Sequence, residues 1–217
     1  EIGSGLVGSE MCIRDSIYFL NQQRSLLALQ KAEKMKKQAF ADRYPYGIFS
    51  CIRTMGHIYK SRGNFDLSAQ YYQEALDYML KNMPDQDPSQ LYSSLAEYYR
   101  NTQKDYATAL DYCEKALKSA KTERNIAQAM IEKCLVLFRQ GRIDEFNDCY
   151  KEAVQMADRC KLSASVSLLI AHISKNILDK QYEQAHAHAD QLSEKGLQQH
   201  AYIYECAKDL SLIHISE

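Results

Sequence analysis

The chain has 217 residues and a formal net charge of −1, because 27 basic side chains are balanced by 28 acidic ones. This length is enough to bury a substantial core in one domain, whereas the near-neutral charge, without a long basic run, argues against a nucleic-acid partner. No apolar run approaches the roughly 20 residues that a membrane-spanning helix needs, so we expect no membrane insertion of this segment.

The predicted elements are helices throughout, because apolar residues recur at spacings of three and four and alternating stretches are short. Residues 17–39 are expected to form the second helix of a truncated unit. Four helix pairs follow, and Gly63-Asn64 and Gly141 mark the turns inside the first and third of them. The pairs are predicted at 47–62 with 65–82, 88–101 with 105–120, 125–140 with 143–158, and 163–178 with 181–195, and residues 197–209 are expected to begin another.

The same residue types return at matching places in successive pairs. Gly56, Tyr59, Phe65, Tyr72 and Ala75 are echoed by Ala96, Tyr99, Tyr106, Cys113 and Ala116, and more weakly by Cys134, Leu137, Ile143, Tyr150 and Ala153. Two helices can approach closely where small residues recur, and the aromatic residues fill the spaces between layers. This self-similarity predicts an array of stacked helix pairs, since one pair cannot bury its apolar face alone.

The pattern resembles the tetratricopeptide repeat family, whose units are about 34 residues long. The units here are longer, since Ala75, Ala116 and Ala153 lie 41 and 37 residues apart, and the extra residues are expected in turns such as 83–88 and 121–124. Units of this length resemble those of bacterial regulatory and sensor proteins and of cargo adaptors. The resemblance covers roughly residues 47–195 and implies an all-α, right-handed superhelical solenoid of about four antiparallel helix pairs, truncated at both ends, over residues 17–209.

Residues 1–16 and 210–217 do not follow the repeat. Both resemble translated sequencing-adaptor strings, so we expect them to be non-native tails on a fragment of a longer protein. The first contains Gly3-x-Gly5-x-x-Gly8, but the dinucleotide-binding fingerprint requires a preceding strand and a βαβ unit, and no strand is predicted here. The sequence therefore predicts no nucleotide cofactor.

The resemblance implies that the first helix of each pair lines a concave surface and that its inward-facing residues bind a partner. The polar end of this groove carries several cations, whereas Ile170 and Ile177 make the other end apolar. A partner segment with acidic side chains at one end and aliphatic or aromatic ones at the other would be complementary. Alternatively, Ile170 and Ile177 pack against a further unit. The candidate partner-binding residues are Arg53, His57, Lys60, Gln90, Glu97, Arg100, Asn101, Gln128, Leu135 and Arg139.

Residues typical of catalysis or metal binding are not arranged in a recognisable motif. The sequence has no HExxH, GxSxG, P-loop or kinase signature, so no enzyme is predicted. His186 and His188 are the best metal candidates, but residues two apart on a helix point in nearly opposite directions, and two ligands are too few for zinc. Seven cysteines show no CxxC pair, and Cys113 and Cys134 fall at apolar repeat positions, which predicts buried free thiols and no metal.

These observations predict a non-catalytic scaffold that holds a peptide, a segment of a partner protein, or another part of its own parent chain in the groove. The alternative is a sensory or regulatory module of a larger bacterial signalling protein, such as a two-component sensor kinase or a transcription regulator. Exposed faces on the terminal units are also expected to favour self-association. The free thiols favour the cytoplasm, with the periplasm as the alternative for a sensor kinase.

Overall fold

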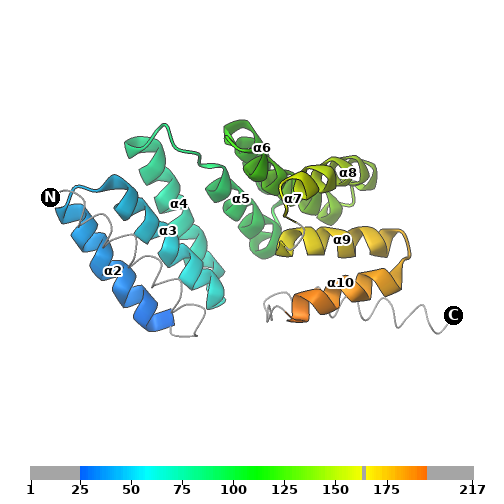
Figure 1. The fold of residues 1–217 in the computed structure, drawn as a ribbon, viewed down its shortest axis with the longest axis horizontal. Helices are drawn as coiled ribbons and strands as arrows, with labels where there is room; N and C mark the ends of the chain where they lie inside the picture. Colours follow the sequence, from blue (N-terminus) through cyan, green and yellow to red (C-terminus); the bar gives the residue numbers. More distant parts are fainter. Residues whose placement is uncertain (1–24, 163–164, 195–217) are drawn as a thin grey trace.

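The computed structural model describes residues 25–162 and 165–194, so the predicted tails at 1–16 and 210–217 and the predicted helix at 197–209 lie outside the described residues. Within the described part, every regular element is a helix, and the helices follow one another in a row from α2 to α10 (Figure 1). Their bounds are α2 Ser25–Ala41, α3 Pro45–Ser61, α4 Phe65–Asn82, α5 Ser89–Tyr98, the short π-helix η1 Tyr99–Gln103, α6 Tyr106–Ser119, α7 Glu123–Arg139, α8 Ile143–Arg159, α9 Val166–Leu178 and α10 Tyr182–Glu194.

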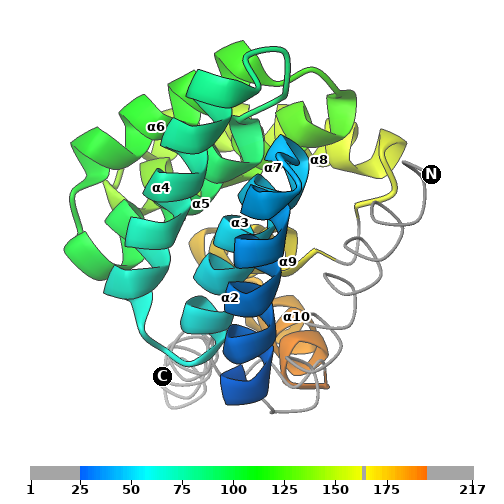
Figure 2. The same ribbon diagram turned by 90° about the vertical axis from the view of Figure 1, so that its left-hand side faces the viewer.

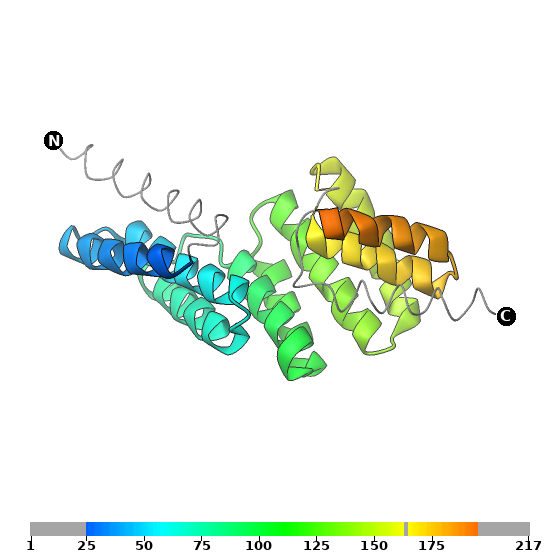
Figure 3. The same ribbon diagram turned by 90° about the horizontal axis from the view of Figure 1, so that it is seen from below.

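The helices pack as antiparallel pairs. Helix α3 packs mainly on α4, α5 on α6, α7 on α8 and α9 on α10, while α2 packs on the other side of α3. Helix α7 also contacts both α5 and α9, so the first helices of successive pairs line up on one side of the array. The row is elongated in Figure 3, and Figure 2 shows that α2 and α10 point in different directions, so the pairs rotate along the array. The predicted superhelical solenoid of helix pairs is confirmed.

The repeat positions lie where helices cross. Ala75, Ala109 and Ala116 are fully buried. Gly56 on α3 meets the ring of Tyr72 on α4 so closely that a Cβ added to the glycine would lie 2.7 Å from the ring. The small residues of the repeat therefore allow the close approach that the aromatic residues of the neighbouring helix then fill.

Left-handed backbone conformations close the turns inside the pairs. Gly63 and Gly141 have φ angles of 75° and 73°, a conformation that costs glycine nothing but other residues about 1–2 kcal/mol. Lys104 and Lys180 adopt φ angles of 55° and 59° at the corresponding turns of the second and fourth pairs. All four turns lie where the predicted helix pairs place them, but only the two that contain glycine carry a residue typical of this conformation.

The second pair differs from its prediction as one continuous helix over 88–101. Helix α5 ends at Tyr98, and a π-turn follows in which the backbone N–H of Lys104 donates to the carbonyl of Tyr99. Pro88 occupies the N-cap position, and the Asp87 carboxylate accepts from the N–H of Ser89 at 2.8 Å. The wide π-turn carries Arg100 inward, where its side chain is buried.

Two large apolar clusters form the core. One joins α2, α3, α4 and α5 through residues such as Ile52, Tyr72 and Leu95, and the other joins α7 to α10 around Phe146 and Ile173. Between them lies a small cluster of buried residues from α5, α6 and α7, namely Ala96, Ala109, Cys113 and Val136. Across the described residues, none of the helices has both the length and the apolar character that crossing a bilayer would require.

Candidate functional site

Two adjoining pockets follow α5 along the concave side of the array. The larger, of about 610 Å³, lies at the α5–η1 end, between α3 and α4 on one side and the end of α7 on the other. The smaller, of about 320 Å³, lies at the start of α5, between α3 and the start of α7. Tyr72, Ser94 and Glu97 line both pockets, so the two form one groove, which we call the α5 groove.

Nine of the ten candidate partner-binding residues line this groove. The larger pocket holds Lys60, Glu97, Arg100, Asn101 and Arg139, and the smaller holds Arg53, His57, Gln90, Glu97 and Gln128.

Leu135 was placed in the groove by the sequence analysis, and this placement is wrong. Its side chain is 2% exposed and belongs to the core cluster of α7 to α10, because α7 is packed on by α6, α8 and α9 and little of its surface remains free. Ile170 is buried in the same cluster and Ile177 packs against it, so the predicted apolar end of the groove is part of the core.

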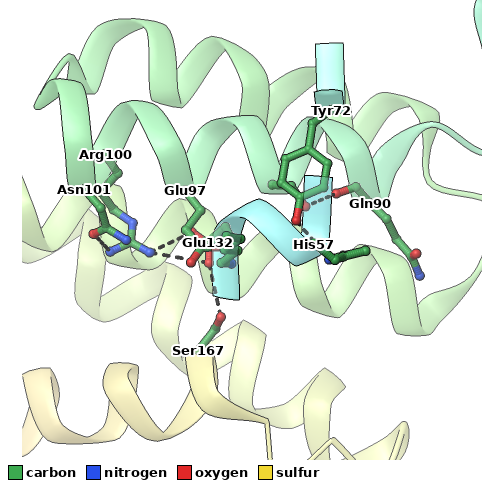
Figure 4. Close-up of polar contacts among 10 residues, drawn as sticks. His57, Tyr72, Gln90, Glu97, Arg100, Asn101, Glu132 and Ser167 are labelled. Carbon is green, nitrogen blue, oxygen red and sulfur yellow. Dashed lines mark hydrogen bonds and ion pairs between the residues drawn. The ribbon is translucent and has the colours of Figure 1, made fainter. Parts of the chain in front are cut away.

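Polar contacts connect the first helices of successive pairs beneath the groove (Figure 4). Lys60 Nζ of α3 lies 2.5 Å from Glu97 Oε2 of α5. Arg100 of η1 donates to Glu132 Oε2 of α7 at 3.0 Å, and the hydroxyl of Ser167 at the start of α9 donates to Glu132 Oε1 at 3.2 Å. These contacts tie all four pairs together through side chains.

Arg100 and Glu132 form a buried ion pair, with side-chain exposures of 3% and 2%. Arg100 also donates to Asn101 Oδ1 at 2.8 Å. Burial raises the pKa of Glu132, and the adjacent Arg100 guanidinium opposes this rise. Because Glu132 neutralises Arg100, this arginine is a structural part of the groove wall and adds little net positive charge to the groove.

His57 faces Tyr72 across the smaller pocket. The Tyr72 hydroxyl and His57 Nδ1 share a hydrogen bond of 2.9 Å, and the two rings meet edge to face with centroids 5.3 Å apart. Desolvation by the surrounding walls, together with the charges of Arg53 and Lys60, lowers the pKa of His57 to about 4 against the opposing effect of Glu97. His57 is therefore neutral at physiological pH and offers the groove a hydrogen-bonding ring without charge.

The charge of the α5 groove is strongly biased. Its only acidic lining residues within the described part are Glu97 and Glu132, and both are already ion-paired. Arg53, Lys104, Arg124 and Arg139 also line it, and none of these four forms an ion pair within residues 25–162 and 165–194. The groove thus carries four cations whose charge is not neutralised by the described protein.

Part of this lining was missed by the sequence analysis. Lys104 and Arg124 lie in predicted turns, between residues 101 and 105 and at 121–124. The larger pocket also includes aromatic side chains of the second helices, Phe65 and Tyr106, together with Tyr98 of α5. The family resemblance directs attention to first helices only. The clustering of basic residues near the helix ends is the one signal that could have added Lys104 and Arg124.

Comparison with known proteins agrees with this geometry. A family model described as tetratricopeptide repeat matches residues 54–78, which span the α3–α4 turn. The match covers the second part of α3 and most of α4. No curated protein matches the chain.

Two similar solved structures contain nearly identical TPR-like repeats from a protein of Podosopora anserina named as a kinesin light chain. One, a single-substitution variant, shares 10% identity with a TM-score of 0.57 and covers 96% of each chain. The other shares 11% identity with a TM-score of 0.56, over 93% of this chain and 94% of that one. At this identity the likeness shows the fold alone, which is that of a tetratricopeptide-like solenoid.

Metal chemistry has no obvious place among the described residues, since no group of three or more His, Cys, Asp and Glu side chains there is arranged to hold an ion. What the α5 groove can do is bind anionic groups by charge-assisted hydrogen bonds, beside aromatic surfaces that accept apolar side chains.

Proposed function

We propose that the α5 groove binds an extended, acidic segment of a protein partner or of the parent chain, and that this role is non-catalytic. The observation that carries the proposal is the set of four cations without ion pairs, Arg53, Lys104, Arg124 and Arg139, around one groove whose two carboxylates are already paired. Carboxylates of an incoming segment would supply the missing counter-charges.

The dimensions of the groove set the length of the segment. Helix α5 and η1 together span residues 89–103, a length of about 22 Å at 1.5 Å per residue. An extended chain rises about 3.3 Å per residue, so about seven residues would follow α5 from end to end.

Aromatic surfaces suggest the order of side chains in that segment. Phe65, which is 39% exposed, lines the larger pocket together with Tyr98 and Tyr106, whereas the smaller pocket holds Arg53 and Arg124. We therefore expect an aromatic or aliphatic side chain in the larger pocket, flanked by carboxylates that reach Lys104 and Arg139 there and the two arginines of the smaller pocket.

Selection from a phage-displayed library of random octapeptides on the full chain tests this proposal. Recovered peptides should be enriched in Asp and Glu beside an aromatic or aliphatic residue, and fluorescence anisotropy of labelled copies should show affinity that falls with salt. The double variant Lys104→Glu/Arg139→Glu should weaken binding at least tenfold. Lys118→Glu/Lys151→Glu, which reverses two exposed charges outside the groove lining, is the matched control and should change it less than twofold.

Selection of basic peptides, or equal binding by both double variants, would contradict the proposal. The alternative role as a sensory module of a bacterial signalling protein rests on the length of the repeat units and stays a prediction. Self-association also stays a prediction, and the surface it would use includes Leu26 and Phe40 of α2, which are 63% and 54% exposed.

A further inference from the structure

Two cysteine side chains face each other between the helices of the third pair. Cys134 lies on α7 and Cys149 on α8, and their Sγ atoms are 2.7 Å apart. Both are free thiols. Cys149 Sγ also lies 3.5 Å from the carbonyl oxygen of Met130, one turn before Cys134 on α7.

The repeat explains how this contact arises. Cys134 occupies the place that Gly56 and Ala96 hold in the first and second pairs, where the two helices of a pair approach most closely. A residue on the facing helix is therefore within reach of a side chain as short as cysteine. A disulfide places its two sulfur atoms about 2.05 Å apart, so the 2.7 Å between them here leaves only a small further approach of the side chains.

The two thiols differ in access to solvent. Cys134 is fully buried, whereas Cys149 is only partly buried. The hydrogen bond that the Cys134 thiol donates lowers the pKa of Cys149. Burial opposes this change, and the charge of Lys133 adds to it. The same hydrogen bond raises the pKa of Cys134. An oxidant arriving from solvent would therefore meet Cys149 first.

We propose that Cys134 and Cys149 form a dithiol site that a low-molecular-weight disulfide, such as oxidised glutathione, converts into a disulfide between α7 and α8. The Cys149 thiolate attacks one sulfur of the small disulfide, whose S–S bond breaks and releases one thiolate. Cys134 then gives up its proton and attacks Cys149 Sγ, which expels the second small thiolate. The protein loses two hydrogens and two electrons are transferred to the small disulfide, which leaves as two thiols.

This proposal is independent of what the α5 groove binds. The bond would fix α7, which lines the groove, to α8 behind it. The cross-link closes a short loop, because only 15 positions separate the two cysteines along the chain.

Tryptic mapping tests the proposal directly. The full chain is treated with oxidised glutathione at pH 8 without denaturant, then alkylated and digested. Trypsin places Cys134 in a peptide of residues 134–139 and Cys149 in one of residues 143–151, and neither contains another cysteine. We expect the two peptides to appear joined, with a mass two hydrogens below their sum, and to separate on reduction.

Single variants distinguish the order of the two steps. In Cys134→Ser the reaction should stop at Cys149 carrying glutathione, whereas in Cys149→Ser residues 134–139 should remain an unmodified thiol until the chain is unfolded. Cys160→Ser is the matched control, because Cys160 is another half-buried thiol next to the end of α8, and the 134–149 link should form as in the parent. Circular dichroism of each variant verifies that it is folded, and Cys134→Ala replaces Cys134→Ser if the latter is not.

A folded parent chain in which both peptides stay separate, or in which Cys149 joins Cys160 instead, would overturn the proposal. So would a Cys134→Ser variant whose Cys149 fails to take up glutathione while remaining folded.

Discussion

Replacing Arg100 with methionine should destabilise the fold by about 3–5 kcal/mol, the usual cost of removing one partner of a buried ion pair. Glu132 would be left as a carboxylate with 2% exposure, whose remaining described contact is the Ser167 hydroxyl at 3.2 Å. Methionine fills most of the volume of the arginine stem, so the loss comes from the uncompensated charge.

The double variant Arg100→Met/Glu132→Met separates charge from packing. Apolar residues of similar volume often replace a buried pair without loss or with a gain of about 1–4 kcal/mol, so the double variant should recover most of the stability lost in Arg100→Met. Urea unfolding followed by far-ultraviolet circular dichroism measures all three chains. Arg142→Met is the matched control: it breaks the ion pair of Arg142 with Glu145, which is exposed, and should leave the urea midpoint nearly unchanged.

The pH dependence provides an independent check. Without Arg100, burial would raise the pKa of Glu132 against the charge of Lys60 alone, so the folded value would lie above the unfolded one. A carboxyl of this kind favours the folded state only when protonated. The deficit of Arg100→Met should therefore shrink as the pH falls from 8 towards 5. Equal deficits at both pH values, or a double variant no more stable than Arg100→Met, would refute the reasoning.

Five further substitutions test other parts of the fold by urea or thermal unfolding. Ala75→Trp or Ala116→Trp should cost about 1–3 kcal/mol because both alanines are fully buried at helix crossings, and unchanged melting would show that the register is wrong. Lys104→Gly should raise the free energy of unfolding by about 1 kcal/mol, and Gly63→Ala should lower it by a similar amount, since both positions have positive φ angles. A Lys104→Gly variant less stable than the parent would contradict this. Burial would raise the pKa of Asp87, but hydrogen bonds from Ser89, Lys121 and Asn125 outweigh it and lower this pKa. Ionised Asp87 should therefore stabilise the fold above about pH 4, and the deficit of Asp87→Asn should disappear as the pH falls below that value. A deficit that stays constant with pH would contradict this expectation.

The periodic part of the structure could be predicted from the sequence, because it depends on contacts between residues close in the chain. Small and aromatic residues at Gly56, Tyr72 and Ala75 set the register of the first pair. The predicted helix ends agree with α4 and lie within about three residues for the other helices, except for the start predicted at residue 17, which lies outside the described residues. Nine of the ten candidate residues line the α5 groove, because the first helix of each pair does face the concave side.

The remaining features depend on how successive pairs are oriented. Arg100 meets Glu132 across 32 positions, and only because the π-turn of η1 widens the end of α5. Leu135 was assigned to the groove because one face of a first helix was expected to be free, whereas α7 is covered on several sides. Lysine at the left-handed turns gave no signal, since only glycine marks such a turn in a sequence.

The small cluster of Ala96, Ala109, Cys113 and Val136 has a mechanical consequence. It is the smallest buried apolar cluster among the described residues, and it lies between one block formed by α2 to α5 and another formed by α7 to α10. We expect the array to bend at this cluster, and amide exchange to divide at the same place. The larger pocket spans this joint, since Phe65 and Arg139 lie on its opposite sides. A segment bound in this pocket would therefore contact both blocks and hold them in one relative orientation. Its affinity would depend on the curvature of the whole array.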